Sequence, residues 1–344
     1  MNPDQAPPTA LPAVDMHVHI VGTGAGGTGC WLGLDGLYRR WQARLLLSAI
    51  GMHPRDLDGD FDRLYVEHLL ERLRESSLGA AVILAQERVH DPQGKPVPGA
   101  GLFHVPNDYV LALARRHPEF LPAVSIHPAR PDALEELDRC IAGGAMMMKL
   151  LPNVQHVDCS DRRFTRFWER MAAAGLPLLS HTGGEKTLPV VDASLANPRH
   201  LERPLEVGVT VIAAHCGTKS ALFDPQWFPD FVEMTRRHPN LYGDTSAFSV
   251  LNNRIRGRVV PETQSEPLAS RILHGSDWPV PVSAFWARAK GLIDAANHTA
   301  WARHPNLLER DYQLKRAMGY APECFTRVWS LLPPRKGMAT ASVR

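Results

Sequence analysis

Short apolar runs alternate with longer amphipathic segments along most of the chain, and this alternation predicts the secondary structure. Short runs rich in apolar residues are typical of buried strands, while apolar positions three or four residues apart are typical of helices. Eight strands are expected, at residues 13–20, 80–85, 121–127, 145–151, 176–181, 209–215, 241–246 and 271–277. Helices are expected at about 36–45, 61–77, 107–117, 131–142, 161–174, 198–207, 229–238 and 282–296, with two more helical stretches after them.

This order of elements predicts one closed barrel. Strands that alternate with helices form a parallel sheet, and eight such units favour a (β/α)₈ or TIM barrel, here a single domain over residues 13–332. The second strand begins late, so residues 21–60 are expected to form a long lid insertion in the first βα loop. Residues 1–12 and 333–344 are expected to be flexible tails.

Composition and charge exclude several classes of protein. The chain has 344 residues, of which 44% are hydrophobic and 22% charged, as in a soluble globular protein. A net charge of +2 with scattered basic residues predicts no nucleic-acid or membrane partner. The five cysteines include no Cys-x-x-Cys pair, and the chain shows no secretory leader. No apolar run approaches the ~18 residues of a membrane span. These observations predict a cytoplasmic protein.

Polar residues close several of the predicted strands. The first strand carries a His-x-His pair, whose side chains point to one face about 6–7 Å apart because strand side chains alternate. Four later strands also end in a residue suited to acid–base or metal chemistry. Since the carboxyl ends of barrel strands form the active-site mouth, all of these side chains are expected to meet there. They are His17, His19, Lys149, His181, His215 and Asp277.

Four of these residues predict a metal site. Imidazole and carboxylate suit Zn²⁺, and also Mn²⁺ or Fe²⁺. His17, His19, His181 and Asp277 would hold one ion and leave a position for water, whose pKa the ion lowers. Asp277 could also carry the proton to the leaving group.

Lys149 and His215 leave the number of ions open. His215 could bind a second ion, or act as a base and electrophile toward the substrate. Desolvation and nearby positive charge favour the neutral amine of Lys149, which can take up carbon dioxide and bridge two ions as a carbamate. The alternatives are a lysine that anchors substrate or pairs with a carboxylate such as Asp277 or Asp244.

Taken together, these residues resemble the amidohydrolase superfamily of metal-dependent barrels, over about residues 13–330. Residues 144–152, Gly-Ala-Met-Met-Met-Lys-Leu-Leu-Pro, are similar to the carbamylated-lysine strand of the binuclear dihydroorotases. That comparison implies that all six residues are ligands. Residues 274–279, His-Gly-Ser-Asp-Trp-Pro, are more similar to the amidohydrolase-related branch, which includes aminocarboxymuconate-semialdehyde decarboxylase and is often mononuclear. This second comparison implies that Lys149 and His215 bind no metal and that His215 is catalytic.

The resemblance implies an enzyme with a small-molecule substrate, and we expect a homodimer. The main expectation is an amidohydrolase-type hydrolase that uses metal-activated hydroxide on an amide, lactone or ester carbonyl. The alternative is a mononuclear zinc-dependent non-oxidative decarboxylase or lyase acting on an unsaturated or aromatic carboxylic acid. The third hypothesis is a metal-dependent binding or scaffold protein. Dihydroorotase itself is not expected, because Ile20-Val21-Gly22 follows the histidine pair where that family has an arginine.

A glycine-rich segment offers a rival interpretation. Residues 22–27, Gly-Thr-Gly-Ala-Gly-Gly, satisfy the G-x-G-x-x-G pattern of dinucleotide-binding proteins. That fingerprint requires a helix to begin within the motif, whereas loop residues continue to Gly33. We therefore expect a mobile loop over the barrel mouth. Trp31 and residues 38–41 could complete a lid or form an ordinary cover or dimer contact, and Glu185 and Lys219 could contact substrate.

Overall fold

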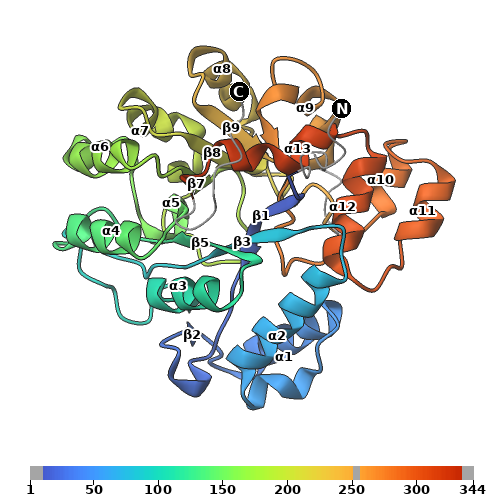
Figure 1. Ribbon diagram of the computed structural model, residues 1–344, viewed down its shortest axis with the longest axis horizontal. Helices are drawn as coiled ribbons and strands as arrows, with labels where there is room; N and C mark the ends of the chain where they lie inside the picture. Colours follow the sequence, from blue (N-terminus) through green and yellow to red (C-terminus); the bar gives the residue numbers. More distant parts are fainter. Residues whose placement is uncertain (1–10, 251–255, 335–344) are drawn as a thin grey trace, which may run out of the picture.

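Parallel strands enclose the centre of the molecule in the order in which they occur in the chain (Figure 1). The eight strands are β1 (Val14–His19), β3 (Ala80–Leu84), β5 (Phe120–Val124), β6 (Met147–Leu150), β7 (Leu178–His181), β8 (Val211–Ala214), β9 (Leu241–Asp244) and β10 (Ile272–Leu273). Hydrogen bonds from Met16 N to His274 O (3.1 Å) and from His19 N to Trp278 O (2.8 Å) join the last segment to the first and close the barrel. The computed structural model describes residues 11–250 and 256–334, and it confirms the predicted single-domain (β/α)₈ fold.

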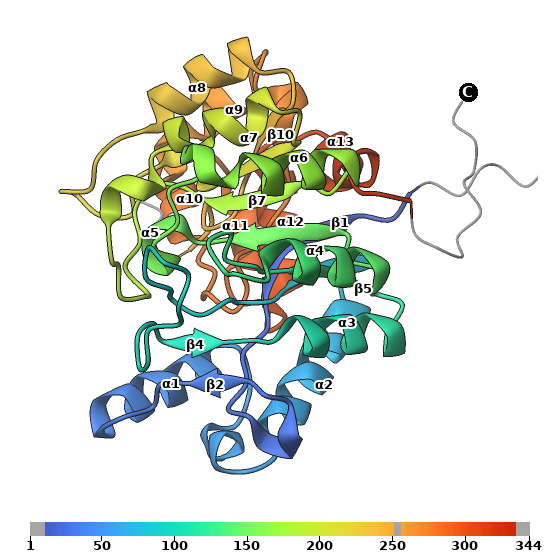
Figure 2. The same ribbon diagram turned by 90° about the vertical axis from the view of Figure 1, so that its left-hand side faces the viewer.

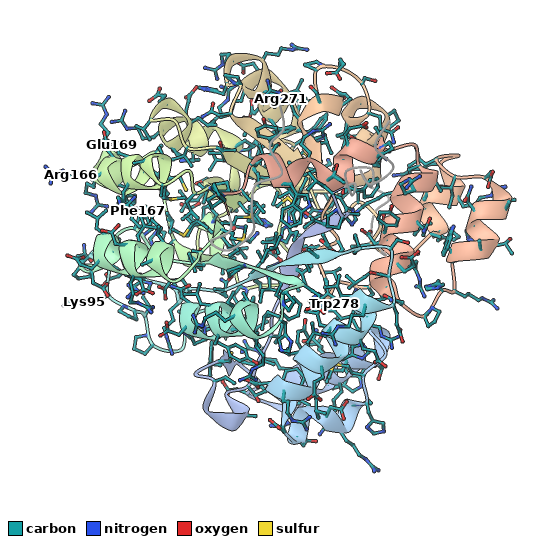
Figure 3. The ribbon with its side chains drawn as sticks, in the orientation of Figure 1. Lys95, Arg166, Phe167, Glu169, Arg271 and Trp278 are labelled. Carbon is teal, nitrogen blue, oxygen red and sulfur yellow. The ribbon has the colours of Figure 1, made fainter. Side chains whose placement is uncertain are left out.

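Helices surround the barrel because each presents one apolar face to the strands. On α6, for example, Phe167 is buried whereas Arg166 and Glu169 are exposed and point outward (Figure 3). The longer helices are α1 (Leu37–Ala49), α2 (Phe61–Arg74), α3 (Asn107–Arg116), α4 (Ala133–Ala142), α6 (Thr165–Ala173), α8 (Phe228–Arg237), α11 (Ala295–Trp301) and α12 (Leu307–Ala317). The short ones are α5 (Pro152–Gln155), α7 (Glu202–Glu206), α9 (Val260–Thr263), α10 (Phe285–Ala289) and α13 (Pro322–Thr326).

The insertion forms a separate layer at one side of the barrel. Its strand β2 (Trp31–Leu32) pairs antiparallel with β4 (Phe103–His104), a pairing that the sequence did not predict. This small sheet and α1 lie on the same side of the barrel as α2, and Figure 2 shows β2 between α1 and α2 (Figures 1 and 2). A second difference is the helix predicted at 282–296, which is divided into α10 and α11 by Gly291 at φ +69° and by the N-cap of Asp294.

The ends of the chain leave two predictions open. The predicted tails, 1–12 and 333–344, lie almost wholly outside the described residues. Among the described helices, none combines the length and the apolar character needed to cross a lipid bilayer.

Candidate metal centre

A bulge in β1 turns the histidine pair toward one end of the barrel. The pairing of β1 with β3 shifts register between Asp15 and Val18, and such a bulge alters which side chains face inward. Met16 packs inside the barrel, whereas Val18 packs between the strands and the outer helices. His17 and His19 consequently line the same cavity.

Three metal-ligating atoms form a small triangle at this position. Nε2 of His17 and Nε2 of His19 are 3.3 Å apart, and each lies 3.4 Å from Oδ1 of Asp277. The centre of such a triangle is about 2 Å from each atom, the distance at which Zn²⁺ binds histidine and carboxylate. Among the described residues, these three form the group whose ligand atoms all lie within 4.8 Å of one another. The donor set therefore fits one divalent ion.

Asp244 at the end of β9 orients His17. Its Oδ2 lies 2.8 Å from His17 Nδ1, so the ring proton is held on Nδ1 and Nε2 keeps the lone pair that a metal requires. Oδ1 of the same carboxylate accepts hydrogen bonds from the backbone N–H of His215 (2.8 Å) and of Ser246 (3.0 Å). Burial, and then the charge of Lys149, hold the pKa of His17 well below its usual value. The ring is therefore neutral, as a ligand must be.

His215 is held as a neutral base beside this triangle. Its Nδ1 is 2.8 Å from Ser246 Oγ and 3.1 Å from Ser246 O. Because Ser246 donates its only hydroxyl proton to Asp244, the ring proton lies on Nδ1 and the lone pair on Nε2. Burial, and then the charge of Arg256, hold the pKa of His215 well below its usual value.

Asp277 lies beyond the last residue of β10, not at the end of a strand as predicted. Its N–H donates to His17 O (3.0 Å), and its φ of +72° falls in the left-handed region, where non-glycine residues are rare. Gly275 allows this close approach, since a Cβ there would lie 2.8 Å from His17 Cβ. Burial raises the pKa of Asp277, but the hydrogen bond from His19 and the neighbouring positive groups outweigh it and bring the pKa to about 2.

Lys149 and His181 complete the predicted set. Nζ of Lys149 is fully buried and lies 3.2 Å from His17 Nε2, and burial lowers its pKa to about 8. His181 ends β7, and its buried Nε2 has no hydrogen-bond partner among the residues that the structure describes. Burial lowers the pKa of His181 to about 3. This nitrogen is free to bind a metal ion, although His181 does not belong to the group formed by His17, His19 and Asp277.

One cavity brings all six predicted residues together. It has a volume of about 770 Å³, and His17, His19, Lys149, His181, His215 and Asp277 all line it. The insertion contributes a largely apolar wall. Its lining residues are Val21, Leu32, Gly33, Leu34, Arg39, Gln42, Ala43, Leu46, Leu47, Ile50 and Leu57. Of the predicted lid side chains, Arg39 lines the cavity, whereas Tyr38 and Trp41 are exposed and stack on each other.

The glycine run packs beside the cavity: none of residues 22–27 lines it, whereas Val21 and Gly33 on either side of the run do. Asp62 of α2 accepts hydrogen bonds from Thr23 N (2.6 Å) and Gly24 N (3.2 Å), which fixes the run against the start of that helix. A 3₁₀ turn, η1 (Ala25–Gly27), follows, and the next α-helix begins only at Leu37. The geometry therefore agrees with the rejection of a dinucleotide fingerprint.

The two charged loop residues that were expected to contact substrate, Glu185 and Lys219, differ in position. Glu185 lines the cavity, whereas Lys219 donates to Leu222 O in its own loop. Sequence reasoning missed Arg256, which lines the cavity and is only 5% exposed. It lies in the long connection between β9 and β10, where no strand pattern or motif singled it out.

The closed parallel barrel carries a His-x-His pair, an aspartate and a lysine around one cavity. These features place the protein in the class of barrel enzymes with a candidate divalent-metal site. The chain belongs to the amidohydrolase family, whose model matches residues 14–320. No curated protein matches the chain.

Two solved structures with TM-scores above 0.5 agree on the fold, and a third has a lower score. An uncharacterised TIM-barrel protein from Bordetella bronchiseptica matches with a TM-score of 0.58 and 20% identity, covering 88% of this chain and 99% of that one. A putative 2-pyrone-4,6-dicarboxylic acid hydrolase from Pseudomonas putida matches with a TM-score of 0.55 and 14% identity, covering 94% and 97%. A 2,6-dihydroxybenzoate decarboxylase from Rhizobium matches with a TM-score of 0.47 and 17% identity, covering 90% and 99%.

Proposed function

We propose that this protein is a metal-dependent hydrolase that cleaves an amide, lactone or ester bond of a small molecule. The observation that carries the proposal is the triangle of His17 Nε2, His19 Nε2 and Asp277 Oδ1, with edges of 3.3–3.4 Å, which fits one divalent ion such as Zn²⁺. A bound divalent ion would polarise the scissile carbonyl and lower the pKa of a water molecule toward neutrality.

The chain's own residues supply the proton transfers. Asp277 has a pKa of about 2 and is therefore an ionised carboxylate at neutral pH, so it can accept a proton from the attacking water and pass it to the leaving group. His215 presents the lone pair of Nε2 as a second acceptor, since Ser246 holds the ring through Nδ1. The apolar wall of the insertion lowers the polarity of the cavity, which strengthens electrostatic interactions within it.

A second reaction has one observation in its favour. Within the described part of the chain there is one group of three His or carboxylate atoms that could bind an ion together, those of His17, His19 and Asp277. This arrangement suits one ion better than two, as in the mononuclear, non-oxidative decarboxylases of unsaturated or aromatic carboxylic acids. His215 would then be the catalytic histidine.

The test is to assay the metal-loaded enzyme against lactones, esters, amides and unsaturated or aromatic carboxylic acids in ¹⁸O-labelled water. Hydrolysis places ¹⁸O in the organic product, whereas decarboxylation releases carbon dioxide and leaves the organic product without ¹⁸O. We expect Asp277→Asn to lose activity by about 10²–10⁴-fold with an unchanged melting temperature. Asp230→Asn, on the outer helix α8, is the matched control and should keep full activity. Metal-loaded protein that hydrolyses none of the panel, or full activity in Asp277→Asn, would overturn the proposal.

A further inference from the structure

We propose that the substrate is an amphipathic carboxylate, with its anionic group bound by Arg256 and its apolar part held against the wall formed by the insertion. The inference rests on the proposed function and names the class of molecule on which that site would act. It places the two ends of the substrate on opposite sides of the candidate metal triangle.

Arg256 is a buried cation that forms no ion pair with any residue the structure describes, and the charges of Asp277 and Glu185 act on it from farther away. Its side chain is 5% exposed and lines the cavity. It donates to Thr218 Oγ1 (3.1 Å) and Gly184 O (2.7 Å), and it forms no ion pair with any described residue. Burying an unpaired guanidinium is costly, whereas a bound carboxylate would offset that cost. A guanidinium matches the two oxygens of a carboxylate through paired hydrogen bonds.

Arg256 lies on the side of the cavity that contains the later histidines. Its positive charge contributes to lowering the pKa of His181 and of His215, so the guanidinium lies close to both rings. The carboxylate of Glu185 lines the same region, but its Oε1 already accepts hydrogen bonds from two backbone N–H groups, those of Thr187 and Leu188. Because Glu185 and Asp277 also face the cavity, a ligand with one negative charge is favoured over a doubly charged phosphate.

The opposite wall is apolar and belongs to different elements. Leu32 of β2 and Leu46 and Leu47 of α1 line it, together with Phe103 of β4. Phe103 stands edge-on to His19, with ring centroids 6.2 Å apart, so this wall begins directly beside the candidate metal triangle. A cavity of about 770 Å³ is within the range that holds a molecule of drug size, far more than a carboxylate alone needs. The remaining space is suited to an alkyl or aryl group.

The experiment measures binding, not turnover, by calorimetry on both the metal-loaded and the chelator-treated full-length protein. The probes are octanoate, octylamine and acetate. We expect octanoate to bind about 10-fold or more tightly than either of the others, because octylamine lacks the anion and acetate lacks the apolar part. The preference should persist after chelation, which separates Arg256 from a carboxylate held by a metal. Equal binding of octanoate and octylamine to the wild-type protein would overturn the proposal.

Matched variants test each end. Arg256→Gln should weaken octanoate binding by about 10-fold or more while Arg256→Lys restores part of it, and Arg258→Gln, at an exposed position two residues away, should bind as wild type. Leu46→Asn should weaken octanoate binding but not acetate binding, whereas Leu45→Asn, on the exposed face of α1, should change neither. Should Arg256→Gln fail to fold, the comparison of probes on wild-type protein still decides. Arg256-dependent octanoate binding in a protein without hydrolase activity would refute only the proposed function.

Discussion

At the scale of single residues, the candidate site depends on polar partners that fix each ring before any ion binds. Asp244 accepts the Nδ1 proton of His17, and the hydroxyl of Ser246 lies between Asp244 and His215. Two site residues, His215 at φ +60° and Asp277 at φ +72°, adopt strained backbone conformations. Strain of this kind persists where surrounding interactions hold it, and it is concentrated at functional sites.

The first prediction concerns Asp244, which the triangle itself does not include. Asp244→Asn keeps the shape of the side chain but removes the charge that orients the His17 ring. We expect the affinity for Zn²⁺ to fall by about 10–100-fold, the usual effect of removing a carboxylate behind a histidine ligand. Competition with a chromophoric chelator measures it, and Asp108→Asn, at an exposed ion pair, serves as control. Unchanged affinity would show that Asp244 does not support the site.

The second prediction concerns the buried amine of Lys149. Burial lowers its pKa from 10.5 to about 8, so between these values the unfolded chain binds more protons than the folded one. The stability of the metal-free protein should therefore rise with pH relative to that of Lys149→Met, by on the order of 2 kcal/mol between pH 7 and 10. Urea unfolding of both proteins at several pH values measures this difference. Lys95→Met, at the exposed position labelled in Figure 3, should not alter it, and parallel curves for wild type and Lys149→Met would contradict the assignment.

At the scale of elements, polar contacts add to the apolar core that the insertion shares with the barrel. Asp62 near the start of α2 is buried, and its carboxylate accepts hydrogen bonds from Thr23 and Gly24 as well as from the hydroxyl of Thr28. On the other side of α2, His68 stacks on Trp278, one residue after Asp277, with centroids 6.1 Å apart. α2 thus connects the glycine run to the loop that carries the predicted acid.

The third prediction follows from that connection. Asp62→Ala leaves two backbone N–H groups and two hydroxyls without their acceptor. Since hydrogen bonds to a charged group contribute about 1.5–3 kcal/mol, we expect a loss of roughly 2–4 kcal/mol in stability. Faster amide exchange over residues 22–30 would locate the change. Asp60→Ala, whose carboxylate forms an exposed ion pair with Arg63, should have little effect, and an equal loss in both variants would argue against a specific role for Asp62.

The elements also show what a sequence can and cannot predict. Periodicity located every barrel strand, and the His-x-His pair together with the lysine and histidine strand ends identified the cavity, because these signals are local. Asp277 lines the cavity, but the strand predicted over residues 271–277 ends at Leu273, and contacts with β1 place the rest of the segment. The pairing of β2 with β4 and the position of Arg256 depend on contacts between distant segments, which leave no periodic pattern in the chain.

At the scale of the whole molecule, the cavity lies between two layers of different origin. The barrel supplies the polar residues, and the insertion, seen beside α2 in Figures 1 and 2, supplies the apolar wall. In the proposed function, the barrel therefore supplies the reacting groups and the insertion contacts the apolar part of the substrate. We expect substitutions in α1 to change the preference for the apolar part of the substrate, and substitution of Arg256 to change the preference for its anionic part.

The last prediction concerns the thiols, which are distributed over the whole fold. All five cysteines are free and buried. Burial raises the pKa of Cys30, Cys140 and Cys324 to about 12, and it raises those of Cys159 and Cys216 as well. Below pH 9 the thiols are protonated in both the folded and the unfolded chain, so their contribution to stability is fully present there. As the pH rises from 9 toward 12 the unfolded chain releases these protons first, and the contribution is lost. We expect the midpoint of urea unfolding to fall over this range.

At pH 8 the native protein should react slowly with a disulfide reagent, because the thiolate is the reactive form, whereas all five thiols of the unfolded chain should react. Ser48→Cys, at an exposed position of α1, provides a reactive reference. Rapid reaction of a wild-type thiol in the native state would show that at least one cysteine is accessible, contrary to the packing described above.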